Sequence, residues 1–138
     1  MNKEIKFRVW SKTSEKFFTK DEWFFDFDGG LYFLDIVEND MIRVPDNEYL
    51  VQQYTGLKDK NNVEIYEGDI VKYHECPLAP VVFSPFVVGF VLNTSGRHAI
   101  GDDKYGNYIP LVANCPKEEN VYYEVVGNIF ENSELLEA

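Results

Sequence analysis

The stretch QQYTGLKDKNNVEIYEGDIV, residues 52–71, decides the fold of this chain. A strand-like run ends in five polar residues at 58–62, and a second turn precedes the strand that starts at Ile70. Gly68 can adopt a positive φ without a Cβ clash, and the carboxylate of Asp69 can accept hydrogen bonds from nearby backbone N–H groups. This pair predicts a turn that starts a new strand.

Three further positions in or near this region are predicted to shape the backbone. Asn61 or Asn62 can adopt the left-handed conformation with less strain than most residues, which suits the polar turn. Gly56, just before that turn, is a further candidate for a structural turn. Gly127, inside the last long strand at 121–130, is a candidate bulge residue.

Period-two patterns predict strands along the rest of the chain. Ile5, Phe7 and Val9 alternate with charged residues, as in a half-buried strand. A hairpin is predicted from the strands at 23–27 and 31–36, since Asp-Gly-Gly between them supplies the positive φ of a tight turn. Asn132 or Ser133 can cap one final helical turn. About ten short strands with regular turn signals indicate an all-β barrel or paired sheets.

The predicted fold is therefore mainly β with short helical turns. Antiparallel hairpins would form a small SH3-like barrel with an N-terminal β-hairpin extension. The comparison with SH3-like barrels rests on Gly68-Asp69 followed by Ile70-Val71-Lys72. It is a likeness of fold that implies no function. At 138 residues the chain fits one domain, 1–138, within which the N-terminal hairpins (1–48) and the barrel (49–138) can be drawn as subdomains.

Composition and charge exclude several functions. The formal net charge is −11, and residues 26–50 alone carry seven acidic and one basic residue. Such a surface repels phosphate backbones, so nucleic-acid binding is disfavoured. The N-terminus has no secretory pattern, so we expect a cytoplasmic protein with both thiols reduced. The longest apolar region, 80–92, is too short and interrupted to span a bilayer.

All the His and Cys residues of the chain form the one candidate metal set. Two His and two Cys could complete a tetrahedral zinc site, but structural zinc sites usually bring their ligands as close pairs, and this spacing does not. An activated cysteine beside a histidine would require a geometry that neighbours on one strand face seldom supply. We expect no catalytic residue, no metal and no cofactor. The four residues are His74, Cys76, His98 and Cys115.

Carboxylates cluster at 26–28, 35–40 and 102–103, where solvated turns are the favoured interpretation. Two nearly continuous apolar runs, 81–83 and 86–92, are typical of strands that are buried on two faces or covered by another subunit. The second alternative predicts an interface. Its candidate residues are Val81, Val82, Phe83, Phe86 and Val88.

Three segments together resemble one known family. They are IKFRVW (5–10), QYTGLKDKNNVEIYEGDIV (53–71) and YEVVGNIFENSELL (123–136). The chain resembles the YopX family, small proteins carried mostly by bacteriophages and prophages. The family usually has glycine where this chain has Asn62. The resemblance implies a phage or prophage source and, more weakly, oligomers, but it implies no biochemical activity.

Three functions remain open. The leading hypothesis is a non-catalytic, self-assembling phage or prophage accessory protein that interacts with itself or serves as a structural module. The alternative is an acidic inhibitor that occupies a basic site on a host or phage nucleic-acid protein, motivated by the net charge. The third is an enzyme of unknown class, which would need a pocket with perturbed titratable groups.

Overall fold

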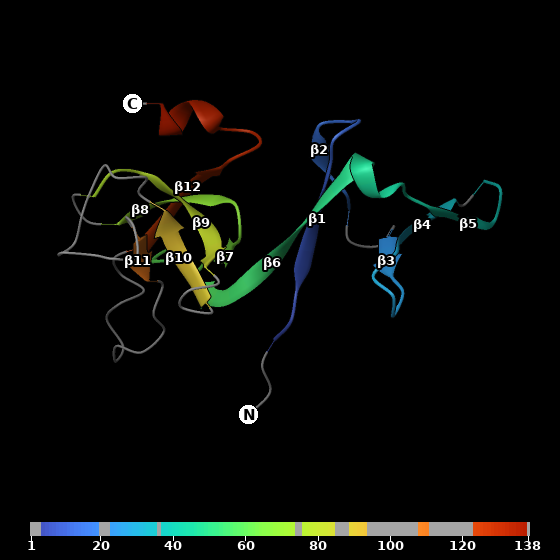
Figure 1. Ribbon diagram of the computed structural model, residues 1–138, viewed down its shortest axis with the longest axis horizontal. Helices are drawn as coiled ribbons and strands as arrows, with labels where there is room; N and C mark the ends of the chain where they lie inside the picture. The colour runs from blue at the N-terminus through green and yellow to red at the C-terminus, as the bar shows by residue number, and fades with distance from the viewer. Residues whose placement is uncertain are drawn as a thin grey trace. The chain divides into compact units, whose positions relative to one another are not determined.

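Antiparallel strands account for nearly all of the regular structure, as the alternating sequence predicts (Figure 1). The computed structural model describes residues 4–19, 23–35, 37–73, 76–84, 89–93, 108–110 and 123–137. Its strands are β1 (Phe7–Ser11), β2 (Lys16–Phe17), β3 (Trp23–Phe25), β4 (Leu31–Asp35), β5 (Asp40–Arg43), β6 (Tyr49–Lys58), β7 (Glu64–Tyr66), β8 (Asp69–Tyr73), β9 (Ala79–Ser84), β10 (Gly89–Asn93), β11 (Tyr108–Pro110) and β12 (Tyr123–Asn128). The helical elements in these residues are two short 3₁₀ helices, η1 (Asp46–Glu48) and η3 (Ser133–Leu136). The mainly β fold class is confirmed, and the SH3-like barrel stays a prediction.

The chain divides into two compact units. The first unit is Lys6–Gln53, and the second unit is Met1–Ile5 with Tyr54–Ala138. Strand β6 contributes to both, since its residues 49–53 pair with β1 and its residues Tyr54 and Lys58 pair with β7. The units meet in sequence after residue 53, whereas the subdomains drawn from the sequence meet after residue 48.

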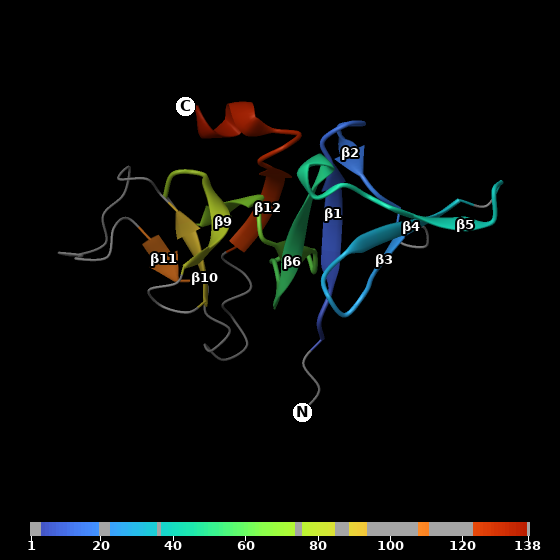
Figure 2. The same ribbon diagram turned by 45° about the vertical axis from the view of Figure 1, so that its right-hand side comes forward.

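The first unit contains two sets of antiparallel strands around one apolar cluster. Strand β1 pairs with β2 and β6, and β4 pairs with β3 and β5; Figures 1 and 2 both show β3, β4 and β5 side by side. On β4, Leu31 and Phe33 alternate with Tyr32 and Leu34, so only one of these two apolar rows can face the core. The core takes the row that contains Leu31. Its buried residues are Val9, Leu31, Val44 and Tyr49, against which Phe18, Trp23, Phe25 and Phe33 pack.

The predicted hairpin between β3 and β4 is confirmed. Oδ1 of Asp26 accepts hydrogen bonds from the N–H groups of Asp28 (3.0 Å) and Gly30 (2.7 Å). Gly29 has a φ of 85°, the left-handed region that glycine enters without strain. Asp26 is therefore a turn residue.

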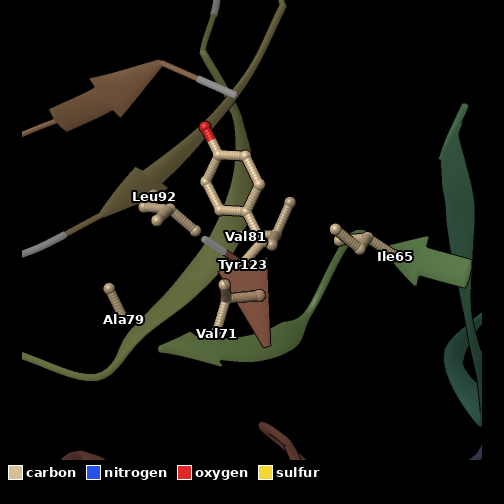
Figure 3. Packing of buried hydrophobic residues seen from close by; sticks show 6 residues of the cluster. All are labelled: Ile65, Val71, Ala79, Val81, Leu92 and Tyr123. Atoms are coloured by element: carbon tan, nitrogen blue, oxygen red, sulfur yellow. The ribbon is translucent and has the colours of Figure 1, made fainter. Parts of the chain in front are cut away.

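The second unit is built on a five-stranded antiparallel sheet in the order β11-β10-β9-β8-β12. Its buried cluster draws side chains from β7, β8, β9, β10 and β12, which Figure 3 shows together. The six residues are Ile65, Val71, Ala79, Val81, Leu92 and Tyr123.

Two strands of this sheet are buried on both faces. The consecutive residues Ile70 and Val71 on β8 are both fully buried, and so are Val91 and Leu92 on β10. Since consecutive side chains of a strand point to opposite faces, the chain itself covers both faces of the sheet at these positions. A continuous apolar run can reflect a strand buried on two faces or one covered by another subunit. Burial on two faces within the chain accounts for the run in β10.

The last helical turn forms where the sequence predicts it, at η3. The side chain of Asn132, however, does not cap it. Asn132 precedes η3 without a side-chain hydrogen bond to the helix. Its Oδ1 accepts instead from the backbone N–H of Asn128 at 3.2 Å, and Oδ1 of Asn128 accepts from Phe130 and Glu131. These bonds order the segment that links β12 to η3.

Candidate functional site

The Gly68-Asp69 turn is held by hydrogen bonds on both sides. Oδ2 of the buried Asp69 accepts from the N–H of Tyr66 at 2.8 Å. Gly68 has a φ of 86°; its N–H donates to the carbonyl of Val81 at 2.8 Å and its carbonyl accepts from Ile129 at 2.9 Å. The turn therefore joins β8 to β9 and to the segment after β12, which is a structural role.

The other predicted turn residues also lie at irregular points of the backbone. Gly56 has a φ of 88° between Tyr54 and Lys58, where the β6–β7 register shifts. Gly127 lies at a register shift of the β12–β8 pairing. Asn62 has a φ of 65°, the left-handed conformation expected for this turn.

Asp59 has a structural role that the sequence pattern did not reveal. Its side chain is only 3% exposed, and Oδ1 accepts from the N–H groups of Asn61 (2.8 Å) and Val63 (2.9 Å). Oδ2 accepts from the N–H of Val125 at 2.9 Å, across 66 residues. The neighbouring Lys60 donates its N–H to the carbonyl of Tyr123. Together these bonds tie the β6–β7 turn to β12.

Only one residue of the candidate metal set lies in the described part of the chain. Cys76 is half-buried and packs against the core of the second unit. His74, His98 and Cys115 lie outside the described residues. Within those residues, no three His, Cys, Asp or Glu side chains come close enough together to hold a metal ion.

The described carboxylates at 26–28 and 35–40 lie in turns or at the strand ends beside them, while 102–103 lie outside the described residues. Oδ1 of Asp35 accepts from the N–H groups of Val37 (3.0 Å) and Glu38 (3.2 Å). Asp35 also lies directly opposite Asp40 in the β4–β5 pairing. Like charges in that arrangement destabilise a sheet, so this end of the hairpin is a local concentration of negative charge.

The described part of the predicted interface segment lies partly in the second unit's core and partly at its surface. Val81 is 0% exposed and Val82 is half-buried, so the interface prediction for Val81 is corrected: its side chain is unavailable to another molecule. Phe83 is 48% exposed, with its ring 5.7 Å from that of Phe90 across the strand pair. Phe86 and Val88 lie outside the described residues.

The first unit exposes an apolar sheet surface, which we call the outer face of β3-β4-β5. Leu34 lies opposite Met41, and these side chains are 45% and 58% exposed. Phe24 lies opposite Tyr32, and their rings stack at 5.6 Å with planes 13° apart. The apolar residues of the outer face are Phe24, Tyr32, Leu34 and Met41, and the exposed Arg43 lies on the same face opposite Tyr32.

Acidic turns flank the outer face at both ends of its strands. Asp26 and Asp28 lie in the β3–β4 turn, and Asp35, Glu38 and Asp40 lie at or in the β4–β5 turn. Arg43 is the one cation among residues 23–43, and it forms an exposed ion pair with Asp46 at 3.6 Å. An apolar centre with negative ends is the result.

Two further features of the first unit have a bearing on its chemistry. A hollow of about 440 Å³ is lined by three phenylalanines, two hydroxyl residues and one lysine: Ser14, Lys16, Phe17, Phe18, Thr19 and Phe33.

Near η1, burial raises the pKa of the Tyr49 hydroxyl above 10.0, and the negative charge of Asp46 raises this pKa further. The Tyr49 hydroxyl donates to Oδ1 of Asp46 at 3.4 Å. Neither feature assembles a nucleophile with a base.

None of the helices in the described ranges is long and apolar enough to cross a membrane.

Antiparallel sheets, buried carboxylates that hold turns and exposed apolar strand surfaces define a small β protein of two units. A family model described as YopX protein matches residues 6–137. The chain therefore belongs to the YopX family, and the resemblance inferred from three segments is confirmed. The match also includes the regions between those segments.

Two solved structures share the fold over nearly their whole length. Protein EF1440 from Enterococcus faecalis is 22% identical, with a TM-score of 0.58; the likeness covers 98% of this chain and 99% of that one. The yopX protein from Bacillus subtilis is 19% identical, with a TM-score of 0.52, covering 94% of this chain and 95% of that one. At these identities the likeness concerns the fold alone. No protein with a curated description matches the chain.

Proposed function

We propose that this chain is a non-catalytic protein-interaction module, and that it is an accessory protein of a phage or prophage in the cytoplasm of a bacterial host. The observation that carries the proposal is the exposure of large apolar side chains on regular strands of both units, at Phe83 and on the outer face of β3-β4-β5. Exposed apolar surface of this kind is typical of protein contact sites. The buried carboxylates Asp59 and Asp69 support the non-catalytic part, because both bind backbone N–H groups of turns.

Self-association through the end of β9 is the first form of the proposal. Phe83 supplies the exposed apolar side chain there. Identical subunits of charge −11 repel one another, so their association must come from local apolar burial.

Light scattering coupled to size-exclusion chromatography tests this form. The wild type should elute at a multiple of the chain mass, and Phe83→Lys should shift it to the monomer. Val63→Lys is the matched control, since Val63 is 46% exposed in the same unit and lies outside the proposed contact. A Phe83→Lys variant that folds and keeps the wild-type mass would contradict self-association through Phe83.

Binding to a cationic protein is the second form, and a specific observation favours it. The outer face of β3-β4-β5 is apolar at its centre and flanked by five acidic residues. Charge complementarity steers association and selects partners of the opposite sign. A basic surface on a host or phage nucleic-acid protein has this chemistry.

A further inference from the structure

Among the described strands, β5 has one edge that pairs with no other strand, and the backbone pattern of this free edge can accept another strand. β5 is the outer strand of the β3-β4-β5 sheet. The N–H of Val44 donates to the carbonyl of Leu31 at 2.8 Å, which makes this a hydrogen-bonded pair. Since bonded and non-bonded pairs alternate in an antiparallel ladder, Asp40 and Ile42 direct their backbone groups to β4. Met41 and Arg43 therefore direct theirs to the free edge.

A carboxylate occupies part of that edge. Oδ1 of Asp40 accepts a hydrogen bond from the N–H of Met41 at 2.8 Å. Charged side chains on edge strands are a usual protection against unspecific strand pairing. A positively charged side chain of an incoming segment would offer this carboxylate another partner and would release the N–H, whereas an acidic segment would be repelled.

The side chains beside the edge match a segment of defined chemistry. Met41 is exposed on the edge strand, with Leu34 beside it on the central strand β4, and the acidic β4–β5 turn lies at one end of the edge. A segment beside β5 would bring one of its ends to the β4–β5 turn, where Asp35, Glu38 and Asp40 lie, whereas the β3–β4 turn is separated from this edge by two strands.

We propose that β5 binds an extended segment of a cationic protein as a fourth strand of the β3-β4-β5 sheet. An apolar side chain of the segment packs against Met41, and Lys or Arg at one end of the segment meets the acidic β4–β5 turn. Backbone hydrogen bonds to Met41 and Arg43 fix its register, as in other cases of strand addition. This inference rests on the second form of the proposed function and adds how the partner is held.

Substitutions at Arg43 separate strand addition from simple charge attraction. Arg43→Gln removes the one cation of the sheet and keeps the backbone N–H at the free edge. Arg43→Pro removes the same cation and also removes that N–H, which is not part of the β4 ladder. Charge attraction alone predicts tighter binding of a cationic peptide by both variants, whereas strand addition predicts tighter binding only by Arg43→Gln.

The probe is a labelled peptide KKTVTVKK with blocked ends, and the readout is fluorescence anisotropy with the full chain. We expect Arg43→Gln to bind at least as tightly as wild type, and Arg43→Pro to bind about tenfold more weakly, as expected for about 1.4 kcal/mol of lost backbone bonding. Leu34→Ser with Met41→Ser should also weaken binding, while Val63→Ser, at an exposed apolar residue of the other unit, should not. Circular dichroism checks that each variant folds. The amide of Arg43 should become protected from hydrogen exchange when the peptide is bound.

If the cationic peptide binds, the inference is overturned by equal binding of the charge-reversed peptide EETVTVEE, or by Arg43→Pro binding as tightly as Arg43→Gln. If Arg43→Pro binds the cationic peptide as tightly but Leu34→Ser with Met41→Ser does not, strand addition is wrong while the outer face still binds cationic protein. If no variant and no wild type binds the cationic peptide, both the inference and the second form of the proposed function fail. Self-association through Phe83 is measured separately and is unaffected.

Discussion

The carboxylate of Asp59 accepts a hydrogen bond at 2.9 Å from the backbone N–H of Val125, 66 residues further along the chain. This hydrogen bond attaches the turn after β6 to the last strand of the second unit. Nζ of Lys60 adds an ion pair at 3.1 Å with the carboxylate of Glu124. The carboxylate bond is the stronger link, since Asp59 is almost fully buried and the ion pair is partly exposed.

Asp59→Ala should therefore be among the most destabilising single substitutions in the chain. It leaves three N–H groups without their acceptor, and the free energy of unfolding should fall by about 3–5 kcal/mol. Asp59→Asn should cost about half as much, because Oδ1 can still accept from Asn61 and Val63 while the amide nitrogen opposes the N–H of Val125. Denaturant unfolding measures both, with the exposed Asp28→Asn as control. Equal stability of Asp59→Ala and Asp28→Asn would contradict this role.

Gly68→Val should destabilise the second unit because Gly68 is held at a φ of 86°. Hydrogen bonds on both its N–H and its carbonyl prevent the turn from relaxing. We expect a loss of about 1–3 kcal/mol for Val and a smaller loss for Asn, which tolerates the left-handed region better. Thermal melting of the two variants checks the order, and an unchanged melting temperature for Gly68→Val would show that the turn is not structural.

Gly127→Ala should introduce a clash with a side chain that orders the C-terminal segment. A Cβ at Gly127 would lie 2.6 Å from Oδ1 of Asn132, the atom that accepts from the N–H of Asn128. We expect the free energy of unfolding to fall by about 1–3 kcal/mol in Gly127→Ala. Because Asn132→Gly removes all three clashing atoms, Oδ1, Cγ and Cβ, the double variant should be about as stable as Asn132→Gly alone. Additive losses in this double-mutant cycle would contradict the contact.

Ionisation of Tyr49 should weaken the first unit at high pH. Burial, followed by the charge of Asp46, raises the pKa of Tyr49 in the folded state, so its neutral form is the one that the fold favours. The stabilising contribution is complete below pH 10 and is lost as the pH rises through the raised pKa. Unfolding curves recorded from pH 8 upward should show a steeper loss for wild type than for Tyr49→Phe. Identical slopes for the two proteins would exclude this residue as the cause.

The turns could be predicted from the sequence because their determinants lie within a few residues of each other. Asp26 and Gly29 form one hairpin turn with local hydrogen bonds alone, and Gly68 with Asp69 forms another. Asn62 needs only the tolerance of asparagine for positive φ. In each case the side chain acts on the backbone that immediately surrounds it.

The contacts that depend on strand pairing could not be predicted. Asp59 stands in the sequence as one polar residue among five, and its partner in β12 is defined only once the sheets have formed. The run that contains Val81 and Val91 suits either an interface or burial on two faces, and the register of β8, β9 and β10 decides between them. Likewise, β4 has apolar residues on both faces, so its sequence does not say that Leu34 is the exposed one.

The salt dependence of the wild-type mass is the most direct measurement of the proposed interaction function. Sedimentation velocity from low to high micromolar concentration, at low and high salt, separates apolar contact from charge. We predict an oligomer that persists or tightens at high salt, because screening weakens the repulsion between chains of charge −11 while apolar burial remains. A wild type that stays monomeric at high micromolar concentration under both conditions, or an oligomer that dissociates as salt is added, would contradict self-association through an exposed apolar surface.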